Sequence, residues 1–236
     1  MSEPQDEAKE FARRLATAKI QYVSLDEGGR YAQITTLGVS TGDYKSYDPR
    51  VIRLFRDFFV RRGSWYLDRG DIFPAVVTLA MANGRGWSLQ AFPIQPEANG
   101  PGYRAALDAL SDDLARQHAR VAGRMLSDLS RIHKVDFEVI EEHNPFKTPA
   151  EFARRPVLTP AEVPAALKAL TGLDRRAFVF GERGVHFQLV FYHRGGKKTA
   201  FRLRPPIYKN AKAARRITNP PLPQPLWSWL YGKPTT

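Results

Sequence analysis

The sequence predicts an α+β fold in which antiparallel sheets, built from hairpins, are combined with one long central helix. Three observations lead to this prediction. Apolar runs come in pairs around short glycine-containing turns, one 30-residue segment has helical leucine spacing, and strands and helices do not alternate as in a doubly wound sheet. With 43% hydrophobic residues, the chain can bury a core and is not of the disordered class.

The N-terminal hundred residues contain the signals of two helices and two hairpins. A helix is indicated where acids precede arginines, and again where an N-cap aspartate and a proline precede a wide apolar face. Hairpins are indicated where glycine turns separate alternating runs. In order, we expect a helix over 5–18, a hairpin turning at 27–30, a helix from Asp48 to Gly63, and a hairpin turning at 83–86.

The remaining residues begin with the long helix and become strongly basic towards the C-terminus. A capping box of Thr159 and Glu162 predicts a short helix that ends at Gly172. The prolines of the tail rule out regular structure through them, and we expect its tryptophans to dock onto the body of the protein. The other expected elements are a helix over 103–132, a strand over 135–143, a hairpin turning at 181–184, a strand over 198–204 and a basic helix over 207–216. The predicted regions are therefore 1–100 (α+β), 101–172 (helical, with one strand) and 173–236 (basic and β-rich, with a Pro/Trp-rich tail).

The positive charge is concentrated in one part of the chain. The net charge is +12, and residues 175–216 hold 12 of the 36 Lys and Arg residues but only one acid, Glu182. Such a block is typical of a surface that binds a polyanion, although a solvated basic face would have the same composition. A further basic stripe recurs on the long helix at Arg116, Arg120 and Arg124, where a salt-bridged surface helix is an equally good interpretation.

Several classes of protein are disfavoured. The absence of cysteine removes disulfides, thiolate nucleophiles and cysteine-ligated zinc. There is no P-loop, no dinucleotide-binding glycine motif and no nucleophile elbow. Neither a transmembrane stretch nor a signal peptide is recognisable, so we expect a cytoplasmic protein with no membrane partner, and we expect no cofactor and no metal.

Two groupings could still support metal chemistry. The acids Asp136, Glu138 and Glu141 are close in sequence, but strand alternation separates Glu141 from the other two. The triplet from His186 to Gln188, followed by Tyr208, resembles in outline the rolling-circle replication and relaxase nucleases. That resemblance implies a metal-dependent DNA-nicking enzyme with a tyrosine nucleophile.

The strand from Val185 to His193 has one apolar face and one polar, aromatic face next to a basic glycine turn. Bases of single-stranded nucleic acid need flat stacking partners and their backbone needs cations, so this face suits RNA somewhat better than DNA. The candidate nucleic-acid-binding residues are Arg183, His186, Gln188, Tyr192, Arg194, Lys197, Lys198, Arg202, Arg204, Lys209, Lys212, Arg215 and Arg216.

His186, Phe187, Leu189 and His193 carry a resemblance to the C-terminal half of CRISPR repeat-processing ribonucleases with ferredoxin-like domains. The resemblance implies ferredoxin-like modules, binding of a structured RNA, and metal-independent endonuclease cleavage by the RNA's own 2′-hydroxyl, with His186 and Tyr208 as catalytic candidates. The family often places a catalytic histidine in its first helix, whereas the first histidine here is His118. A non-catalytic subunit is therefore an equal alternative.

We accordingly expect an RNA-binding subunit, or the RNA-processing component, of a bacterial CRISPR-type ribonucleoprotein of antiviral defence, with other subunits as partners. Two alternatives stay open. One is a plasmid- or phage-encoded protein that binds or nicks DNA. The other is a non-enzymatic interaction factor of a mobile element, whose basic block docks onto an acidic protein.

Overall fold

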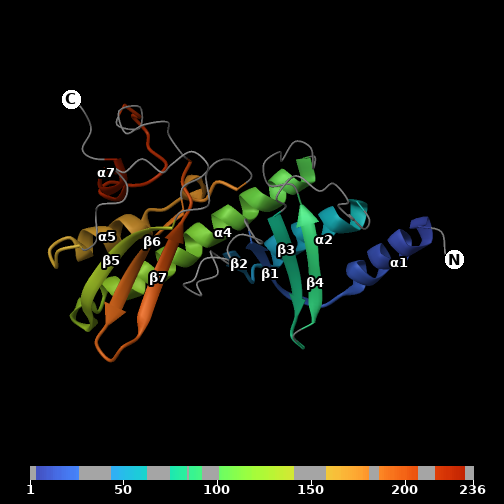
Figure 1. Ribbon diagram of the computed structural model, residues 1–236, viewed down its shortest axis with the longest axis horizontal. Helices are drawn as coiled ribbons and strands as arrows, with labels where there is room; N and C mark the ends of the chain where they lie inside the picture. Colours follow the sequence, from blue (N-terminus) through green and yellow to red (C-terminus); the bar gives the residue numbers. More distant parts are fainter. Residues whose placement is uncertain are drawn as a thin grey trace. The chain divides into compact units, whose positions relative to one another are not determined.

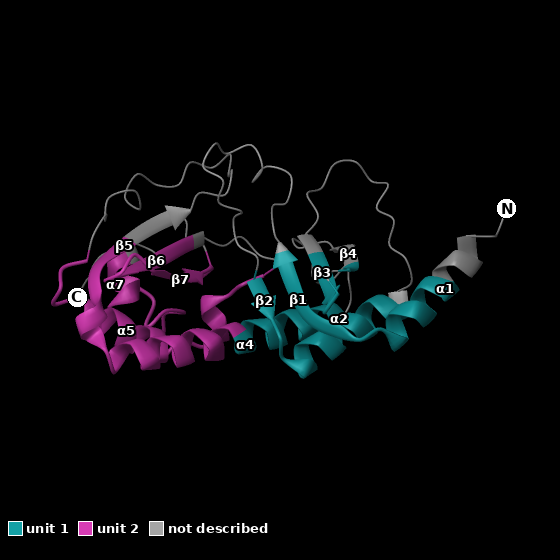
Figure 2. Ribbon diagram, turned by 90° about the horizontal axis from the view of Figure 1, so that it is seen from below, with its two compact units in different colours: residues 1–113 teal, residues 114–236 magenta. Residues whose placement is uncertain are grey.

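The computed structural model describes residues 4–26, 44–62, 75–83, 85–91, 101–140, 158–180, 186–206 and 216–231. The chain is an α+β protein with two antiparallel sheets, as the sequence predicts (Figure 1). It forms two compact units, residues 1–113 and 114–236. The boundary lies inside the long helix α4 (Pro101–Leu126), so the helical middle is not the separate region that we expected (Figure 2).

Unit 1 is built on a four-stranded antiparallel sheet with the order β2-β1-β3-β4. Its strands are β1 (Ile20–Asp26), β2 (Tyr44–Ser46), β3 (Ala75–Met81) and β4 (Gly86–Ala91). The β3–β4 hairpin is the predicted one, whereas the turn expected at 27–30 lies outside the described residues. Because β1 and β2 are direct antiparallel neighbours, these strands do not follow the split β-α-β order of a ferredoxin-like module.

Two predicted helices of unit 1 are present, α1 (Pro4–Thr17) and α2 (Pro49–Arg62). Asp48 caps α2, since its Oδ1 accepts a hydrogen bond from the Arg50 N–H at 2.8 Å. Figure 2 shows α2 along one face of the sheet. Its apolar face, including Phe55 and Phe59, is buried together with the sheet residues that point the same way, Val23, Leu25, Val77 and Leu79.

Unit 2 is built on a three-stranded antiparallel sheet of β5 (Ile132–Ile140), β6 (His186–His193) and β7 (Lys198–Leu203), in that order. The predicted turn between β6 and β7 contains Gly195 and Gly196, whose φ angles of 91° and 86° favour glycine. The hairpin expected to turn at 181–184 was a wrong prediction. β5 and β7 take both sides of β6, and Phe178 instead bridges in parallel to Arg204.

Besides the part of α4 from Leu114 onward, the described helices of unit 2 are α5 (Val163–Thr171), α7 (Leu226–Tyr231) and the short 3-10 helices η1 (Leu129–Arg131) and η2 (Arg175–Ala177). The N-cap of α5 is Glu162 and not the expected Thr159, and Glu162 Oε2 accepts hydrogen bonds from the Thr159 N–H and hydroxyl at 2.8 and 2.9 Å in the turn before the helix. Leu222, Leu226 and Trp227 of the tail are buried, so the predicted docking of the tail is confirmed for these residues. No helix in the described ranges is long and apolar enough to cross a membrane.

Candidate nucleic-acid interface

The two faces of the unit 2 sheet differ in what covers them. Phe187, Leu189 and Phe191 of β6 are fully buried on one face, and Phe201 of β7 lies in the same row as Leu189. The ring of His118 on α4 contacts Phe201, with 5.5 Å between ring centroids, so α4 packs on this face (Figure 2). The opposite side carries Lys134, Asp136, Gln188, Val190, Tyr192, Lys198, Ala200 and Arg202. We call it the open face of unit 2 because Lys134, Lys198 and Ala200 are exposed, although Gln188 and Val190 in its middle are buried.

Tyr192 lies at the centre of a row of three residues at the hairpin end of the open face. Strand register pairs it with Lys134 of β5 on one side and with Lys198 of β7 on the other. Both lysine Nζ atoms lie over the tyrosine ring, at 5.0 and 4.8 Å from its centroid. These distances are typical of cation–π contacts, so the ring is held by an ammonium group from each neighbouring strand.

A β-bulge adds a fourth side chain to this row. Ile132 pairs with His193 and Lys134 pairs with Tyr192, so His133 is an extra residue in β5. Regular alternation would direct His133 and Lys134 to opposite faces, but a bulge re-aims side chains. The His133 ring accordingly contacts Tyr192 edge-on, with centroids 6.3 Å apart. We call His133, Lys134, Tyr192 and Lys198 the Tyr192 cluster.

One carboxylate moderates the charge of the cluster. Asp136 Oδ2 lies 2.8 Å from Lys134 Nζ, and within the described part of the chain Asp136 Oδ1 is buried with no hydrogen-bond partner. Positive charge is nevertheless in excess here. Arg194, Lys197 and Lys198 are exposed at the β6–β7 turn, and none has a carboxylate partner in the described ranges.

The structure separates the predicted binding residues into groups. Tyr192, Lys198 and Arg202 lie on the open face, with Arg194 and Lys197 at the adjacent turn. Arg216 is exposed but belongs to the tail. Arg183, Tyr208, Lys209, Lys212 and Arg215 lie outside the described residues, and of His186 only the backbone is described, paired with Ile140.

Two of the predicted binding residues are buried, so the prediction that they face a ligand was wrong. Gln188 is 8% exposed in the middle of the sheet, and Arg204 is 5% exposed. The Arg204 guanidinium donates to the carbonyl of Val179 and lies 6.0 Å from the ring of Phe180. Arg204 therefore stabilises the fold and does not face a ligand, because β7 ends there and turns into the body of unit 2.

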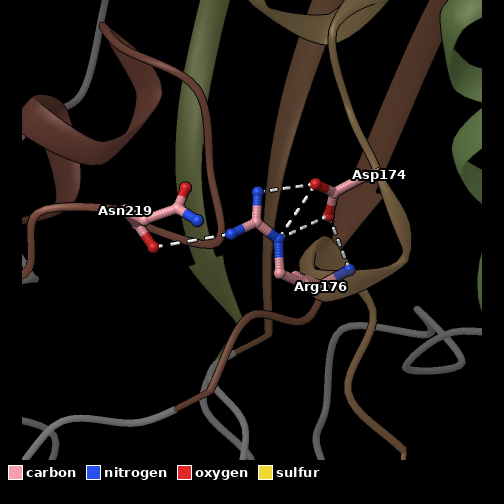
Figure 3. Close-up of polar contacts among 3 residues, drawn as sticks. All are labelled: Asp174, Arg176 and Asn219. Carbon is pink, nitrogen blue, oxygen red and sulfur yellow. Dashed lines mark hydrogen bonds and ion pairs between the residues drawn. The ribbon is translucent and has the colours of Figure 1, made fainter.

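Arg176 of the basic block also has a structural role (Figure 3). Its guanidinium donates to Asp174 Oδ2 at 2.6 and 2.9 Å and to Asp174 Oδ1 at 3.1 Å, and it reaches the carbonyl of Asn219 in the tail at 3.5 Å. Partial burial alone would raise the pKa of Asp174, but the hydrogen bonds and charge of Arg176, with the charge of Arg175, together lower that pKa. Arg176 is thus already neutralised by a neighbouring carboxylate.

The basic stripe of α4 lies on the other side of unit 2. Arg116, Arg120 and Arg124 are exposed, and they are about half a helical turn away from His118, which faces the sheet. The helix therefore separates this stripe from the open face. A single strand of nucleic acid lying flat on the Tyr192 cluster would not touch the stripe.

His118 and His193 have structural partners. Both ring nitrogens of His118 face backbone carbonyls, Nε2 at 2.9 Å from Arg202 and Nδ1 at 3.0 Å from Leu114. His193 Nε2 lies 2.8 Å from the Thr199 hydroxyl. In the described ranges, no three His, Asp or Glu side chains are arranged to hold a metal ion, and Glu141 of the suggested acidic group lies outside those ranges.

Sequence reasoning missed His133 and Lys134 as members of the site. The signal was present, since a His-Lys pair precedes an apolar run, but the bulge that brings both side chains to Tyr192 cannot be recognised without the β6 register. No protein-family model matches the chain, and no curated protein and no solved structure is significantly similar to it. The arrangement of the residues is therefore the basis for a proposal.

Proposed function

We propose that unit 2 binds single-stranded nucleic acid, RNA in preference to DNA, at the Tyr192 cluster. The observation that carries this proposal is the Tyr192 ring with a lysine ammonium group over it from each neighbouring strand, at 5.0 and 4.8 Å from the ring centroid. An aromatic ring beside cations is what proteins use to stack bases and neutralise phosphates without regard to sequence. The exposed Arg194, Lys197 and Lys198 at the adjacent turn support the same class of ligand.

A base can compete successfully for the Tyr192 ring. An exposed cation–π contact contributes about 0.5–1 kcal/mol. Base–aromatic stacking contributes about 1–3 kcal/mol per base, so stacking is the stronger interaction. A base would displace Lys134 or Lys198 from one ring face, and the released ammonium would then be available to a phosphate.

RNA is favoured because a side chain that can both donate and accept hydrogen bonds, His133, lies at the ring edge. The 2′-hydroxyl, which only RNA carries, is both a donor and an acceptor. His133 contacts the ring edge, and an imidazole carries both a hydrogen-bond donor and an acceptor. His133 could therefore bond to the 2′-hydroxyl of a ribose whose base is stacked on Tyr192.

The number of available cations sets the expected salt dependence. Lys134, Lys198 and Arg202 lie on the open face, and Arg194 and Lys197 lie at its turn. If all five contact phosphates, the slope of log K against log salt is about −3.5, since each contact to a single strand contributes about −0.7. The twelve basic residues of the block would give about −8 if all of them took part.

Fluorescence anisotropy of a labelled single-stranded RNA, and of DNA of the same sequence, tests the proposal with the full-length chain. Tyr192→Ala should weaken RNA binding about 5- to 100-fold. The double variant Lys134→Gln/Lys198→Gln should reduce the salt slope by about 1.4. The matched control is Arg120→Gln/Arg124→Gln, which removes the same charge from the opposite side of unit 2 and should leave the slope nearly unchanged. Equal effects of the two double variants would show that binding is non-specific attraction to net charge.

A finer proposal concerns the biological setting. We propose a bacterial, cytoplasmic, RNA-guided ribonucleoprotein of the CRISPR type, with this chain as its RNA-binding subunit or RNA-processing component. The resemblance of the segment from His186 to His193 supports it. Sequencing the nucleic acid that co-purifies with the native protein tests it: one discrete small RNA is expected, and a random mixture would contradict it.

A further inference from the structure

The sheet face of unit 1 that points away from α2 carries a second group of aromatic and basic residues. Val23, Leu25, Val77 and Leu79 point to the helix-covered face. Tyr22 and Ser24 of β1 therefore point the other way, and Lys45 of β2 lies directly opposite Ser24. Tyr47, which follows β2, meets Tyr22 with ring centroids 5.5 Å apart and an interplanar angle of 51°.

The geometry of this group resembles that of the Tyr192 cluster. Lys45 Nζ lies 5.2 Å from the Tyr22 ring centroid, so an ammonium group again packs on a tyrosine that stands on a sheet. Ser24 and Thr78 are cross-strand partners beside it on the same face, and Ser24 is buried there. We call Tyr22, Lys45 and Tyr47 the Tyr47 cluster.

Tyr47 is one of two exposed large hydrophobic side chains in the described ranges, and the other, Leu129, is 37% exposed. Tyr47 is 58% exposed, whereas Tyr22 beneath it is half-buried. A cross-strand aromatic pair can stabilise a sheet edge, and the Tyr22–Tyr47 contact does so here. That contact engages only part of the Tyr47 ring and leaves the rest of its surface open to a planar ligand.

We propose that the Tyr47 cluster is a second stacking site for single-stranded nucleic acid, located in unit 1. The choice of ligand class rests on the function proposed for unit 2, and the site itself rests on the exposure and contacts of Tyr47. The occupant must be planar to stack on the ring and anionic to complement Lys45. A base with its flanking phosphate meets both requirements.

Two sites in one chain predict that affinity depends on strand length. A strand long enough to occupy both sites binds the second one intramolecularly, which raises its overall affinity without new contacts. A strand of about six nucleotides, which one stacking site can accommodate, gains nothing from the second site. Loss of either cluster should therefore weaken long strands more than short ones.

The experiment uses the full-length chain, photo-crosslinking oligouridylates that contain 4-thiouridine, about 6 and about 30 nucleotides long, and peptide mapping of the adducts. We expect crosslinks to peptides of both units. Tyr47→Leu, which keeps apolar bulk but removes the aromatic face, should lower the affinity for the long strand about 5- to 100-fold and abolish the unit 1 crosslink. Tyr47→Phe should behave as the wild type, and Arg53→Gln, on the exposed side of α2, is the control for unit 1.

The outcomes separate this inference from the function proposed for unit 2. If Tyr47→Leu binds as the wild type and no adduct maps to unit 1, the inference is wrong, whatever Tyr192→Ala does. If Tyr192→Ala binds as the wild type while Tyr47→Leu weakens binding, the inference stands and the proposal for unit 2 fails. A loss in Tyr47→Phe as large as in Tyr47→Leu would show that the hydroxyl is required, which also overturns stacking. Thermal melting of each variant confirms that the fold is retained.

Discussion

Acidification from pH 7 to pH 5 should destabilise unit 2 through His118. The imidazole is packed between the rings of Phe178 and Phe201, with ring centroids 5.2 and 5.5 Å away. Burial lowers its pKa from 6.5 to about 4. The carbonyl acceptors of Arg202 and Leu114 favour the charged ring and would by themselves raise the pKa. Burial and the hydrogen bonds therefore shift the pKa of His118 in opposite directions, and the effect of burial is larger.

Whether acid stabilises or destabilises the fold depends on whether the folded or the unfolded chain binds the His118 proton more tightly. In the unfolded chain His118 protonates near pH 6.5, whereas in the folded protein it stays neutral until about pH 4. The contribution to stability is therefore complete above pH 6.5 and is lost as the pH falls from 6.5 towards 4. The full difference amounts to about 3 kcal/mol, and about 2 kcal/mol of it is lost between pH 7 and pH 5.

Urea unfolding of the full-length protein at pH 7, 6 and 5 measures this effect. Trp227 and Trp229 belong to unit 2, so fluorescence reports that unit once Trp65 and Trp87 are replaced by phenylalanine. In this background His118→Gln should lose the extra pH dependence. The exposed His133→Gln is the matched control and should keep it.

Two results would refute the reasoning. Parallel pH profiles of the background protein and His118→Gln would show that His118 has the same pKa in both states. An increase in stability on acidification, lost in His118→Gln, would show that the two carbonyls hold a charged imidazolium and outweigh burial.

Three further predictions concern single side chains. Asp113→Ala should destabilise unit 1 by about 2–3 kcal/mol in urea unfolding, because it leaves the buried Ser46 hydroxyl, now 2.7 Å from Asp113 Oδ2, without that acceptor; a change below 0.5 kcal/mol would contradict it. In the same assay, Arg204→Met should lower the unfolding free energy of unit 2 by about 1–3 kcal/mol, because the Val179 carbonyl loses its donor. The control Arg202→Gln, on the open face, should lower it by less than about 0.5 kcal/mol. Asp136→Asn should raise affinity for single-stranded RNA about two- to fivefold, because it removes the carboxylate 2.8 Å from Lys134 Nζ; weaker binding in the anisotropy assay would mean that Asp136 contacts the ligand.

Local patterns predicted most elements of the fold. The helix signals at Asp48, at Thr159 and along α4 depend on neighbouring residues only, and all three helices formed. The β6–β7 hairpin likewise follows from a glycine turn. The expected hairpin before β6 was wrong because strand pairing is a long-range choice: β5, some fifty residues earlier, makes eight paired positions with β6.

The site was predictable only in part, because the sequence shows which residues are charged but not which of them lie exposed on the surface. Tyr192, Lys197 and Lys198 follow from strand alternation next to a glycine turn, and they lie where expected. Arg176 and Arg204 belong to the same basic block, yet one is paired with Asp174 and the other is buried. Nothing local distinguishes these two arginines from their exposed neighbours, since their partners come from other elements.

The two clusters should differ in how they respond to salt. In the Tyr192 cluster two ammonium groups lie over the ring, so a base binds by displacing a cation that then pairs with a phosphate. In the Tyr47 cluster the one lysine contacts Tyr22, and Tyr47 itself is 58% exposed, so stacking needs no such exchange. Electrostatic contacts weaken steeply as salt rises, whereas stacking does not depend on counterion release. The contribution of Tyr47 should therefore form a growing share of the remaining affinity at high salt, and residual binding there should be more sensitive to Tyr47→Leu than to Lys134→Gln/Lys198→Gln.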